Sequence, residues 1–222
     1  MKIPYVDLKA QWSVEKKELL PQINKVLSKG QYVLGGEIDK FEKNISKICG
    51  SKYAVALNSG TDALTLGLKL LGVGRGDEVI TPPNSFISST TSITHVGATP
   101  VFVDVLSDQN IDPNQIEKII TKKTKAIMPV HLTGRVCEMK PILKIAKKYK
   151  IPIIEDAAQS IGSKYFNQPS GSFGEIGCFS AHPLKNLNAC GDAGFLVTNN
   201  YNFYKKAKIL RNHGLEDRNK VN

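Results

Sequence analysis

A strand passes directly into a helix in the segment Tyr53-Ala54-Val55-Ala56-Leu57-Asn58-Ser59-Gly60-Thr61-Asp62-Ala63-Leu64. Its first five residues are a short apolar run, and a helix is predicted from Thr61 to Leu71. Turn-forming residues at 72–77 and a second short strand at 78–81 follow. This β-α-β order is typical of an α/β domain.

The alternation of strands and helices continues on both sides of this segment. We expect a mostly parallel sheet with helices on both faces, followed after Asp156 by short strands joined by tight turns. Residues 215–222 carry no helix cap or core signal. The further predicted helices cover residues 10–29, 84–96, 112–121, 140–150 and 201–211, and the further strands cover 100–105, 124–130, 151–156, 161–166, 177–180 and 194–198.

Length and composition exclude several classes of protein. The chain has 222 residues, 41% hydrophobic and 23% charged, which is ordinary for one large globular domain. No apolar run approaches the ~20 residues of a membrane span, and the first residues do not form a signal peptide. The cysteines are widely spaced, so we expect buried thiols in a cytoplasmic protein with no membrane association. They are Cys49, Cys137, Cys178 and Cys190.

The net charge of +10 could attract nucleic acid. Its densest basic stretch, residues 140–150, alternates lysines with apolar residues, which indicates an amphipathic helix with a solvated lysine face. No nucleic-acid-binding motif accompanies it. We therefore expect no nucleic-acid partner.

The turn between the first strand and its helix is a candidate anion site. Gly60 allows close backbone approach, the N–H groups at a helix start favour phosphate, and Thr61 adds a hydroxyl donor. The alternative is an ordinary helix N-cap by Ser59 or Thr61.

Two acids, Glu155 and Asp156, end a strongly apolar strand. A carboxylate buried there needs a cationic partner, and the small Ala157 and Ala158 leave room for a flat group. The alternative is an aspartate that caps a helix. A third candidate is Lys185, which lies near apolar residues that would lower its pKa and make its amine nucleophilic, unless it is simply a surface lysine.

Other catalytic classes lack their motifs in this chain. There is no G-x-S-x-G, Walker or G-x-G-x-x-G sequence, and the histidines do not have the spacing of metal ligands, so we expect no metal. Together the three clusters describe one ligand with a phosphate, a ring nitrogen and an aldehyde. Pyridoxal 5′-phosphate has all three.

The sequence also resembles the DegT/DnrJ/EryC1/StrS family of sugar aminotransferases, which are fold-type-I pyridoxal-phosphate enzymes. The resemblance extends in order along nearly the whole chain. It is carried by Val130-His131-Leu132-Thr133-Gly134, Glu155-Asp156-Ala157-Ala158-Gln159 and Ser180-Ala181-His182-Pro183-Leu184-Lys185-Asn186, and by residues 3–8, 30–35, 59–64, 76–80 and 97–104.

The resemblance implies a role for each matched position. Lys185 would bond to the cofactor aldehyde and shuttle a proton, and Asp156 would pair with the ring nitrogen. The remaining implied contacts are to the ring hydroxyl by Gln159, to the two ring faces by Phe86 and Ala158, and to the phosphate by Gly60, Thr61 and Ser180.

The implied reaction moves an amino group from L-glutamate to a keto group of a nucleotide-linked sugar, in a homodimer. Two alternatives stay open: a dehydratase or lyase of the same fold, and a non-catalytic regulator. Some family members replace the lysine with histidine and act as dehydratases, so Lys185 favours transfer.

Two departures from the family pattern concern the later part of the chain. Ala193 replaces a glycine. Family members also continue through a small C-terminal domain, so we expect a truncated large domain that by itself binds the cofactor poorly and does not turn over. The expected organisation is a helical arm at 1–35 and a cofactor-binding domain at 36–222.

Overall fold

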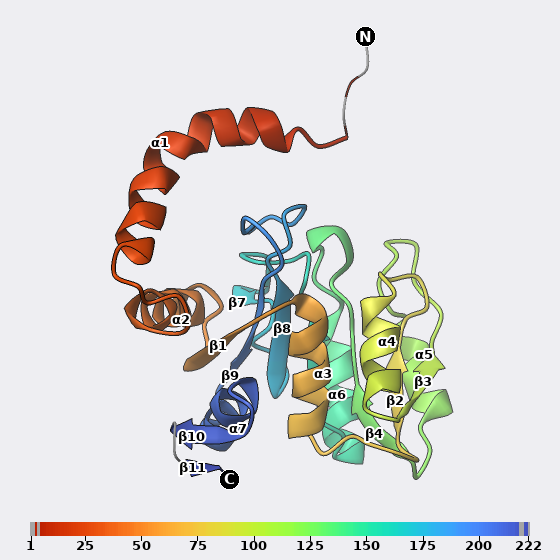
Figure 1. Ribbon diagram of the computed structural model, residues 1–222. Helices are drawn as coiled ribbons and strands as arrows, with labels where there is room; N and C mark the ends of the chain where they lie inside the picture. Colours follow the sequence, from red (N-terminus) through yellow and green to blue (C-terminus); the bar gives the residue numbers. More distant parts are fainter. Residues whose placement is uncertain (1–2, 4, 218–219, 222) are drawn as a thin grey trace. The chain divides into compact units, whose positions relative to one another are not determined.

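The computed structural model describes residues 3, 5–217 and 220–221 (Figure 1). It divides into two compact units, the residues up to Phe41 and those from Glu42 onward, and each is described by itself. The domain boundary expected after residue 35 remains a prediction. The helices are α1 (Leu8–Leu27), α2 (Gly36–Ile48), α3 (Gly60–Leu70), α4 (Ser88–His95), α5 (Pro113–Ile116), α6 (Met139–Tyr149) and α7 (Tyr201–Arg211), with 3₁₀ turns η1 (Glu117–Ile119) and η2 (Leu132–Gly134). The strands are β1 (Tyr53–Leu57), β2 (Glu78–Thr81), β3 (Thr99–Phe102), β4 (Thr124–Ile127), β5 (Ile154–Asp156), β6 (Lys164–Tyr165), β7 (Gln168–Pro169), β8 (Ile176–Ser180), β9 (Gly194–Thr198), β10 (Leu215–Asp217) and β11 (Lys220–Val221).

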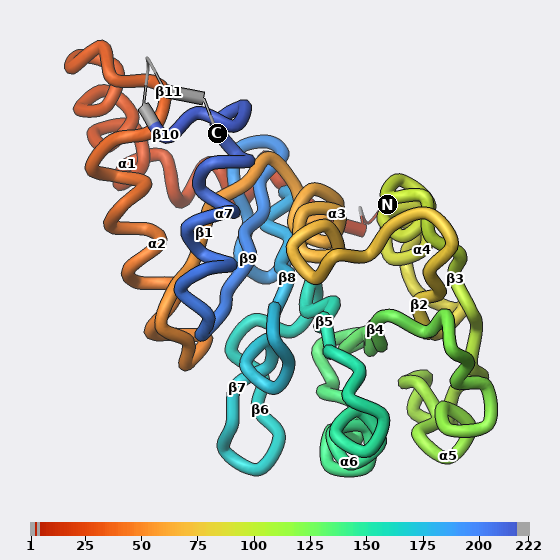
Figure 2. The backbone as a smooth tube through the Cα atoms, turned by 90° about the horizontal axis from the view of Figure 1, so that it is seen from below, coloured from red at the N-terminus to blue at the C-terminus, as the bar shows by residue number. Residues whose placement is uncertain are grey.

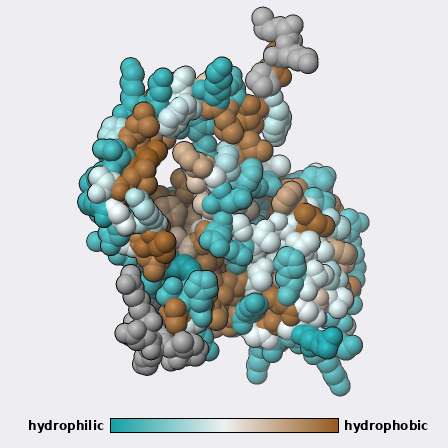
Figure 3. Space-filling view, viewed as in Figure 1, coloured by the Kyte–Doolittle hydropathy of each residue, from teal (hydrophilic) through white to brown (hydrophobic). Residues whose placement is uncertain are grey.

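The first unit contains the long helix α1, which agrees with the helix predicted at 10–29. Asp7 caps it by accepting the Ala10 N–H at 2.9 Å. No residue of α1 is buried. Figure 3 shows hydrophobic side chains along this helix, at the upper left. The exposed apolar residues of α1 are Leu8, Trp12, Val14, Leu20, Ile23 and Leu27.

The second unit is built on a mixed sheet. Strands β3, β2 and β4 pair in parallel, and β5 pairs in parallel with β8. Two parallel bridges, Ile127–Ile153 and Val130–Asp156, join these groups. The strand order is therefore β1-β9-β8-β5-β4-β2-β3, in which β9 alone runs antiparallel to its neighbours. The predicted mostly parallel sheet is confirmed.

Helices cover both faces of this sheet, as predicted. Figure 2 shows α3 and α4 on one side of the strands and α5 and α6 on the other. Leu64 and Leu68 of α3 pack with Ile93 of α4 in one core. Met139 and Ile142 of α6 belong to a second core on the opposite face.

Several predicted elements are shorter in the structure. The helix expected at 84–96 begins only at Ser88, and the side chain of Asn84 before it donates to the carbonyl of Gln109 at 2.9 Å. The strand expected from 151 begins at Ile154, after Pro152, which has no N–H to donate to a sheet. The helix expected at 112–121 is a single α turn followed by a 3₁₀ turn.

The structure differs from the sequence predictions in two further ways. Residues 215–217 and 220–221, which were given no structure, form the antiparallel pair β10–β11. Cys190 is exposed, contrary to the expectation of four buried thiols, because it lies in the loop before β9 and outside the core. Pro4 of the N-terminal motif lies outside the described residues. No helix among the described residues is long and apolar enough to cross a membrane.

Candidate functional site

The three clusters singled out in the sequence meet at one edge of the sheet. Strands β1 and β8 end there, and the antiparallel β9 begins there, because Gly194 pairs with both Leu57 and Ser180. The last residue of β5, Asp156, pairs with Cys178 of β8. In open sheets of this kind, ligands bind outside the carboxyl ends of the strands.

The turn before α3 packs tightly against the neighbouring strand. Ser59 caps the helix by accepting the Asp62 N–H at 3.0 Å. A Cβ atom added to Gly60 would lie 2.8 Å from the Cβ of Ser180, and one added to Gly194 would lie 2.3 Å from the Ser59 carbonyl. Only glycine fits at both positions. Ser59 is thus the N-cap of α3, as the alternative interpretation of this turn predicted. The same turn also presents the free N–H groups of a helix start beside Ser180.

Thr61 connects the start of α3 to the start of α4. Its hydroxyl donates to Ser88 Oγ at 2.8 Å. The same end of α4 carries Phe86, which is 68% exposed and whose carbonyl accepts the Ser89 N–H at 3.1 Å. The aromatic side chain is therefore free to contact a ligand.

Asp156 is a buried carboxylate with two hydrogen-bond donors. Ser89 Oγ donates to Oδ2 at 2.6 Å, and the Ala158 N–H donates to Oδ1 at 3.2 Å. Burial raises the pKa of Asp156, and this effect outweighs the two hydrogen bonds and the charge of Lys185, all of which lower it. The carboxylate thus lies where a cationic group would be strongly attracted.

Lys185 lies in a short turn after β8. Its N–H donates to the His182 carbonyl at 2.8 Å, and the side chain is half-buried. The turn follows β8, which is paired with β5, the strand that ends at Asp156, and the charge of Lys185 lowers the pKa of Asp156. This loop is anchored to the sheet edge because the Ala181 N–H donates to the Ala193 carbonyl at 2.8 Å.

Gln159 follows Asp156 and is fixed by the neighbouring loop. Its side-chain Oε1 accepts the Thr133 N–H at 2.7 Å, which leaves its NH₂ group as the donor available to a ligand. The Ala158 side chain is half-buried beside it. All eight predicted site residues therefore lie at the strand ends, loops and helix starts of this edge.

A buried pair behind the edge was missed by the sequence reasoning. His131 and Glu155 are both fully buried, and Nε2 of the imidazole lies 2.9 Å from Oε2 of the carboxylate. Glu155 also accepts the N–H groups of Gly171, Phe173 and Gly174, each at 2.7 Å. Of the two adjacent acids, Glu155 is thus fixed inside the protein and Asp156 is the one at the site.

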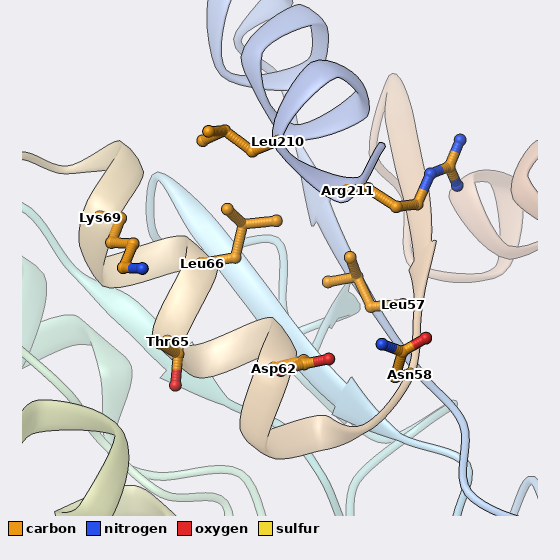
Figure 4. A pocket seen from close by; sticks show the side chains of 8 residues that line it. All are labelled: Leu57, Asn58, Asp62, Thr65, Leu66, Lys69, Leu210 and Arg211. Carbon is orange, nitrogen blue, oxygen red and sulfur yellow. The ribbon is translucent and has the colours of Figure 1, made fainter. Parts of the chain in front are cut away.

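A surface pocket lies beside the edge, between β1, α3 and α7 (Figure 4). Its cavity volume is about 210 Å³, and neither Gly60, Thr61, Asp156 nor Lys185 lines it. Figure 4 shows the Arg211 guanidinium pointing away from Asp62. Arg211 donates to Glu42 at 2.5 Å and to the Ala56 carbonyl at 3.0 Å, which makes it structural.

The edge fits a phosphorylated pyridine aldehyde in three respects. The start of α3, where Gly60 lies directly against Ser180, offers helix N–H groups to a phosphate. The buried Asp156 provides a counter-charge for a ring nitrogen, and Lys185 provides an amine for an aldehyde. Among the described residues, no group of three or more His, Cys, Asp or Glu side chains could hold a metal ion.

Comparison with known proteins gives consistent matches. Residues 13–222 match the family model described as the DegT/DnrJ/EryC1/StrS aminotransferase family. The chain is 44% identical over 214 residues to a UDP-N-acetyl-3-dehydro-alpha-D-glucosamine 3-aminotransferase of Acidithiobacillus ferrooxidans. That match covers 96% of this chain and 58% of the relative, so the chain spans less than two thirds of that relative's length.

Solved structures agree with the sequence matches. The chain superimposes on DesV of S. venezuelae with a TM-score of 0.95 and 38% identity, covering 99% of this chain and 59% of DesV. It superimposes on NtdA of Bacillus subtilis, solved with bound PMP, with a TM-score of 0.93 and 36% identity, covering 100% of this chain and 51% of NtdA. The predicted fold-type-I class is confirmed.

Proposed function

The chain belongs to the DegT/DnrJ/EryC1/StrS aminotransferase family, and from that premise we propose that the whole protein is a pyridoxal-phosphate-dependent aminotransferase. Its substrates are L-glutamate as the amino donor and a nucleotide-linked keto-sugar as the acceptor. The acceptor class is supported by relatives such as the UDP-sugar aminotransferase of Acidithiobacillus ferrooxidans.

One observation carries the proposal. A buried carboxylate, Asp156, ends β5 at the sheet edge, and Lys185 lies in the turn that follows β8, the strand paired with β5. A buried carboxylate and a nearby lysine are the two protein groups that pyridoxal chemistry requires. The Gly60–Ser180 contact supports a phosphate position on the same edge.

The cofactor, when bound, supplies an electron sink for the bond-breaking at the amino-acid α-carbon. Asp156 holds a proton on the ring nitrogen by staying charged opposite it. Lys185 holds the cofactor through Nζ and moves the proton at the α-carbon. Gln159 and Phe86 orient the ring by a hydrogen bond and by stacking, and the start of α3 with Ser180 binds the phosphate.

A homodimer completes the proposal. The apolar residues of α1 are exposed over the length of a 20-residue helix, and an exposed apolar stripe of this kind is typical of an interaction surface. We expect a second copy of the chain to cover it. Light scattering coupled to size exclusion should give twice the chain mass, and replacement of Trp12 and Ile23 with Ser should shift the mass toward one chain.

Reductive trapping tests the cofactor and its lysine. The purified whole protein is mixed with pyridoxal 5′-phosphate, its absorbance is recorded, and borohydride then fixes any lysine adduct for peptide mapping. We expect one major adduct, at Lys185. Lys185→Ala should abolish it, and Lys164→Ala, which removes an exposed lysine of β6, should not.

Glutamate then separates transfer from other chemistry. In the whole protein, conversion of the cofactor absorbance to that of the amine form supports an aminotransferase, whereas no conversion by a whole protein that carries the Lys185 adduct supports a dehydratase or lyase. Adducts spread evenly over many lysines would contradict the proposed site.

A further inference from the structure

We propose that Ser89 is a positioning residue that holds the Asp156 carboxylate in place and in its charged form opposite the cofactor ring. The inference rests on the proposed function, because it assigns Asp156 to the ring nitrogen. Ser89 itself contacts neither cofactor nor substrate in this proposal. It acts through Asp156.

The contact between the two side chains is short and enclosed. Ser89 Oγ lies 2.6 Å from Asp156 Oδ2, although the residues are 67 positions apart in the chain. Ser89 is completely buried and Asp156 is 5% exposed. Because both side chains are buried, the loss of this hydroxyl leaves the carboxylate with one donor fewer.

The direction of hydrogen bonding follows from the chemistry of the groups. A charged carboxylate only accepts, so the single proton of the Ser89 hydroxyl lies toward Asp156. Ser89 Oγ accepts in turn from Ser85 Oγ at 2.8 Å. The two serines therefore form a chain of donors that ends on the carboxylate, and each bond polarises the next.

Ser89 is the strongest of the contacts that favour the charged carboxylate. Burial raises the pKa of Asp156; of the influences that lower it, the Ser89 hydroxyl is the largest, followed by the Ala158 N–H, and the charge of Lys185 also lowers it. His131 lies nearby as a neutral imidazole, because its Nδ1 accepts the Cys137 N–H. Cys178, on the neighbouring strand, adds no charge because burial raises its pKa well above the ordinary range. These are the titratable groups that act on Asp156 from the packed elements.

The Ser- and Thr-rich sequence of α4 gains an explanation from this arrangement. The helix reads Ser88-Ser89-Thr90-Thr91-Ser92, a weak helix-forming sequence. Ser88 accepts from Thr61 at the candidate phosphate turn, and Ser89 donates to Asp156. One helix start thus connects the two halves of the site.

Three variants separate this role from simple packing. Ser89→Ala removes the donor, Ser89→Thr keeps it, and Ser92→Ala is the matched control. Ser92 is equally buried in the same helix, but its hydroxyl donates only to the Ser89 carbonyl of its own helix, at 3.0 Å.

The first measurement uses the chain without cofactor. The pKa of Asp156 is raised in the folded state, so folding favours its protonated form. The free energy of unfolding therefore falls as the pH rises from the pKa of Asp156 in the unfolded chain to its pKa in the folded chain. Ser89→Ala raises this pKa further. Its urea midpoint should therefore fall further below that of the native chain at pH 8 than at pH 5. The deficits of Ser92→Ala and Ser89→Thr should be the same at both pH values.

The second measurement compares two cofactors. One is pyridoxal 5′-phosphate, and the other is its carbocyclic analogue with C–H in place of the ring nitrogen. Ser89→Ala should bind pyridoxal 5′-phosphate about tenfold more weakly, the loss of one hydrogen bond to a charged group, and should bind the analogue as the native chain does. Ser89→Thr should restore the affinity, and Ser92→Ala should not change it.

The outcomes distinguish this inference from the proposed function. Equal losses for both cofactors, or a Ser89→Ala deficit in urea that does not change with pH, would overturn the role of Ser89. If the whole protein binds neither cofactor at Lys185, the proposed function fails, and the unfolding series alone then decides whether Ser89 keeps Asp156 charged.

Discussion

Replacing Glu155 with glutamine tests the buried network behind the site. The two carboxylate oxygens share four contacts: Oε1 accepts the N–H groups of Phe173 and Gly174, and Oε2 accepts that of Gly171 and lies 2.9 Å from His131 Nε2. A glutamine keeps one accepting oxygen. In either orientation of the glutamine side chain, its NH₂ group is a donor that faces two other donors, so the two hydrogen bonds on that side cannot form.

The histidine cannot relieve this conflict by moving its proton. Its other nitrogen, Nδ1, already accepts the Cys137 N–H at 3.2 Å, so Nε2 remains the donor. Two hydrogen bonds to a charged group are therefore lost. At about 1.5–3 kcal/mol each, Glu155→Gln should lower the free energy of unfolding by roughly 3–6 kcal/mol, a large part of the total for a domain.

Urea unfolding followed by circular dichroism at pH 7 measures this loss. The matched control is Glu117→Gln, which removes the same charge from an exposed glutamate paired with Lys148 and should change the unfolding midpoint far less. A Glu155→Gln variant no less stable than Glu117→Gln would refute the reasoning that the four contacts depend on the carboxylate.

Three further predictions concern other contacts of the second unit. Gly60→Ala should cost about 1–3 kcal/mol and weaken pyridoxal-phosphate binding, because the new Cβ would lie 2.8 Å from that of Ser180; urea unfolding and spectral titration measure the two effects. Arg211→Ala should cost about 3–5 kcal/mol in urea unfolding, because it leaves the buried Glu42 without its cation. In native chain at pH 8, a thiol reagent should rapidly modify one cysteine, the exposed Cys190, and all four after unfolding in urea.

Each of these three predictions has a control. Gly74→Ala should be neutral in both assays, because the nearest atom to its new Cβ is 3.9 Å away. Lys40→Ala removes an exposed partner of Glu37 and should not reproduce the effect of Arg211→Ala. Burial and, less strongly, the charge of Glu155 raise the pKa of Cys49 to about 12, so fast modification of Cys49 in the native chain would contradict the described core.

The sheet could be predicted where apolar runs are bounded by turn residues. The strands at 53–57 and 78–81 and the helix at 201–211 have the predicted bounds. The direction of β9 could not be predicted, since the apolar sequence of residues 194–198 suits either direction. Its antiparallel course is set by pairing with strands distant in the sequence.

The site was predictable only where a residue type is chemically distinctive. Asp156, Lys185 and Gly60 follow or precede regular elements at a sheet edge, and family resemblance assigns them roles. Ser89 carries no such signal, because serine is common and its partner lies 67 residues away. The sequence also did not show which of the adjacent acids, Glu155 or Asp156, lies at the site. Adjacent strand residues face opposite sides of a sheet, and the loop at 171–174 determines which of the two acids is enclosed.

The pairing of β1 with β9 also sets the order in which the protein can assemble during synthesis. The N–H of Lys52, just before β1, donates to the Asn199 side chain 147 residues later. At roughly 5–20 residues per second, a ribosome needs about 7–30 s to deliver that partner. Until then the emerging β1 has an open edge that other nascent chains could join, so chaperones that shield unpaired strands should improve the yield of this protein in cells.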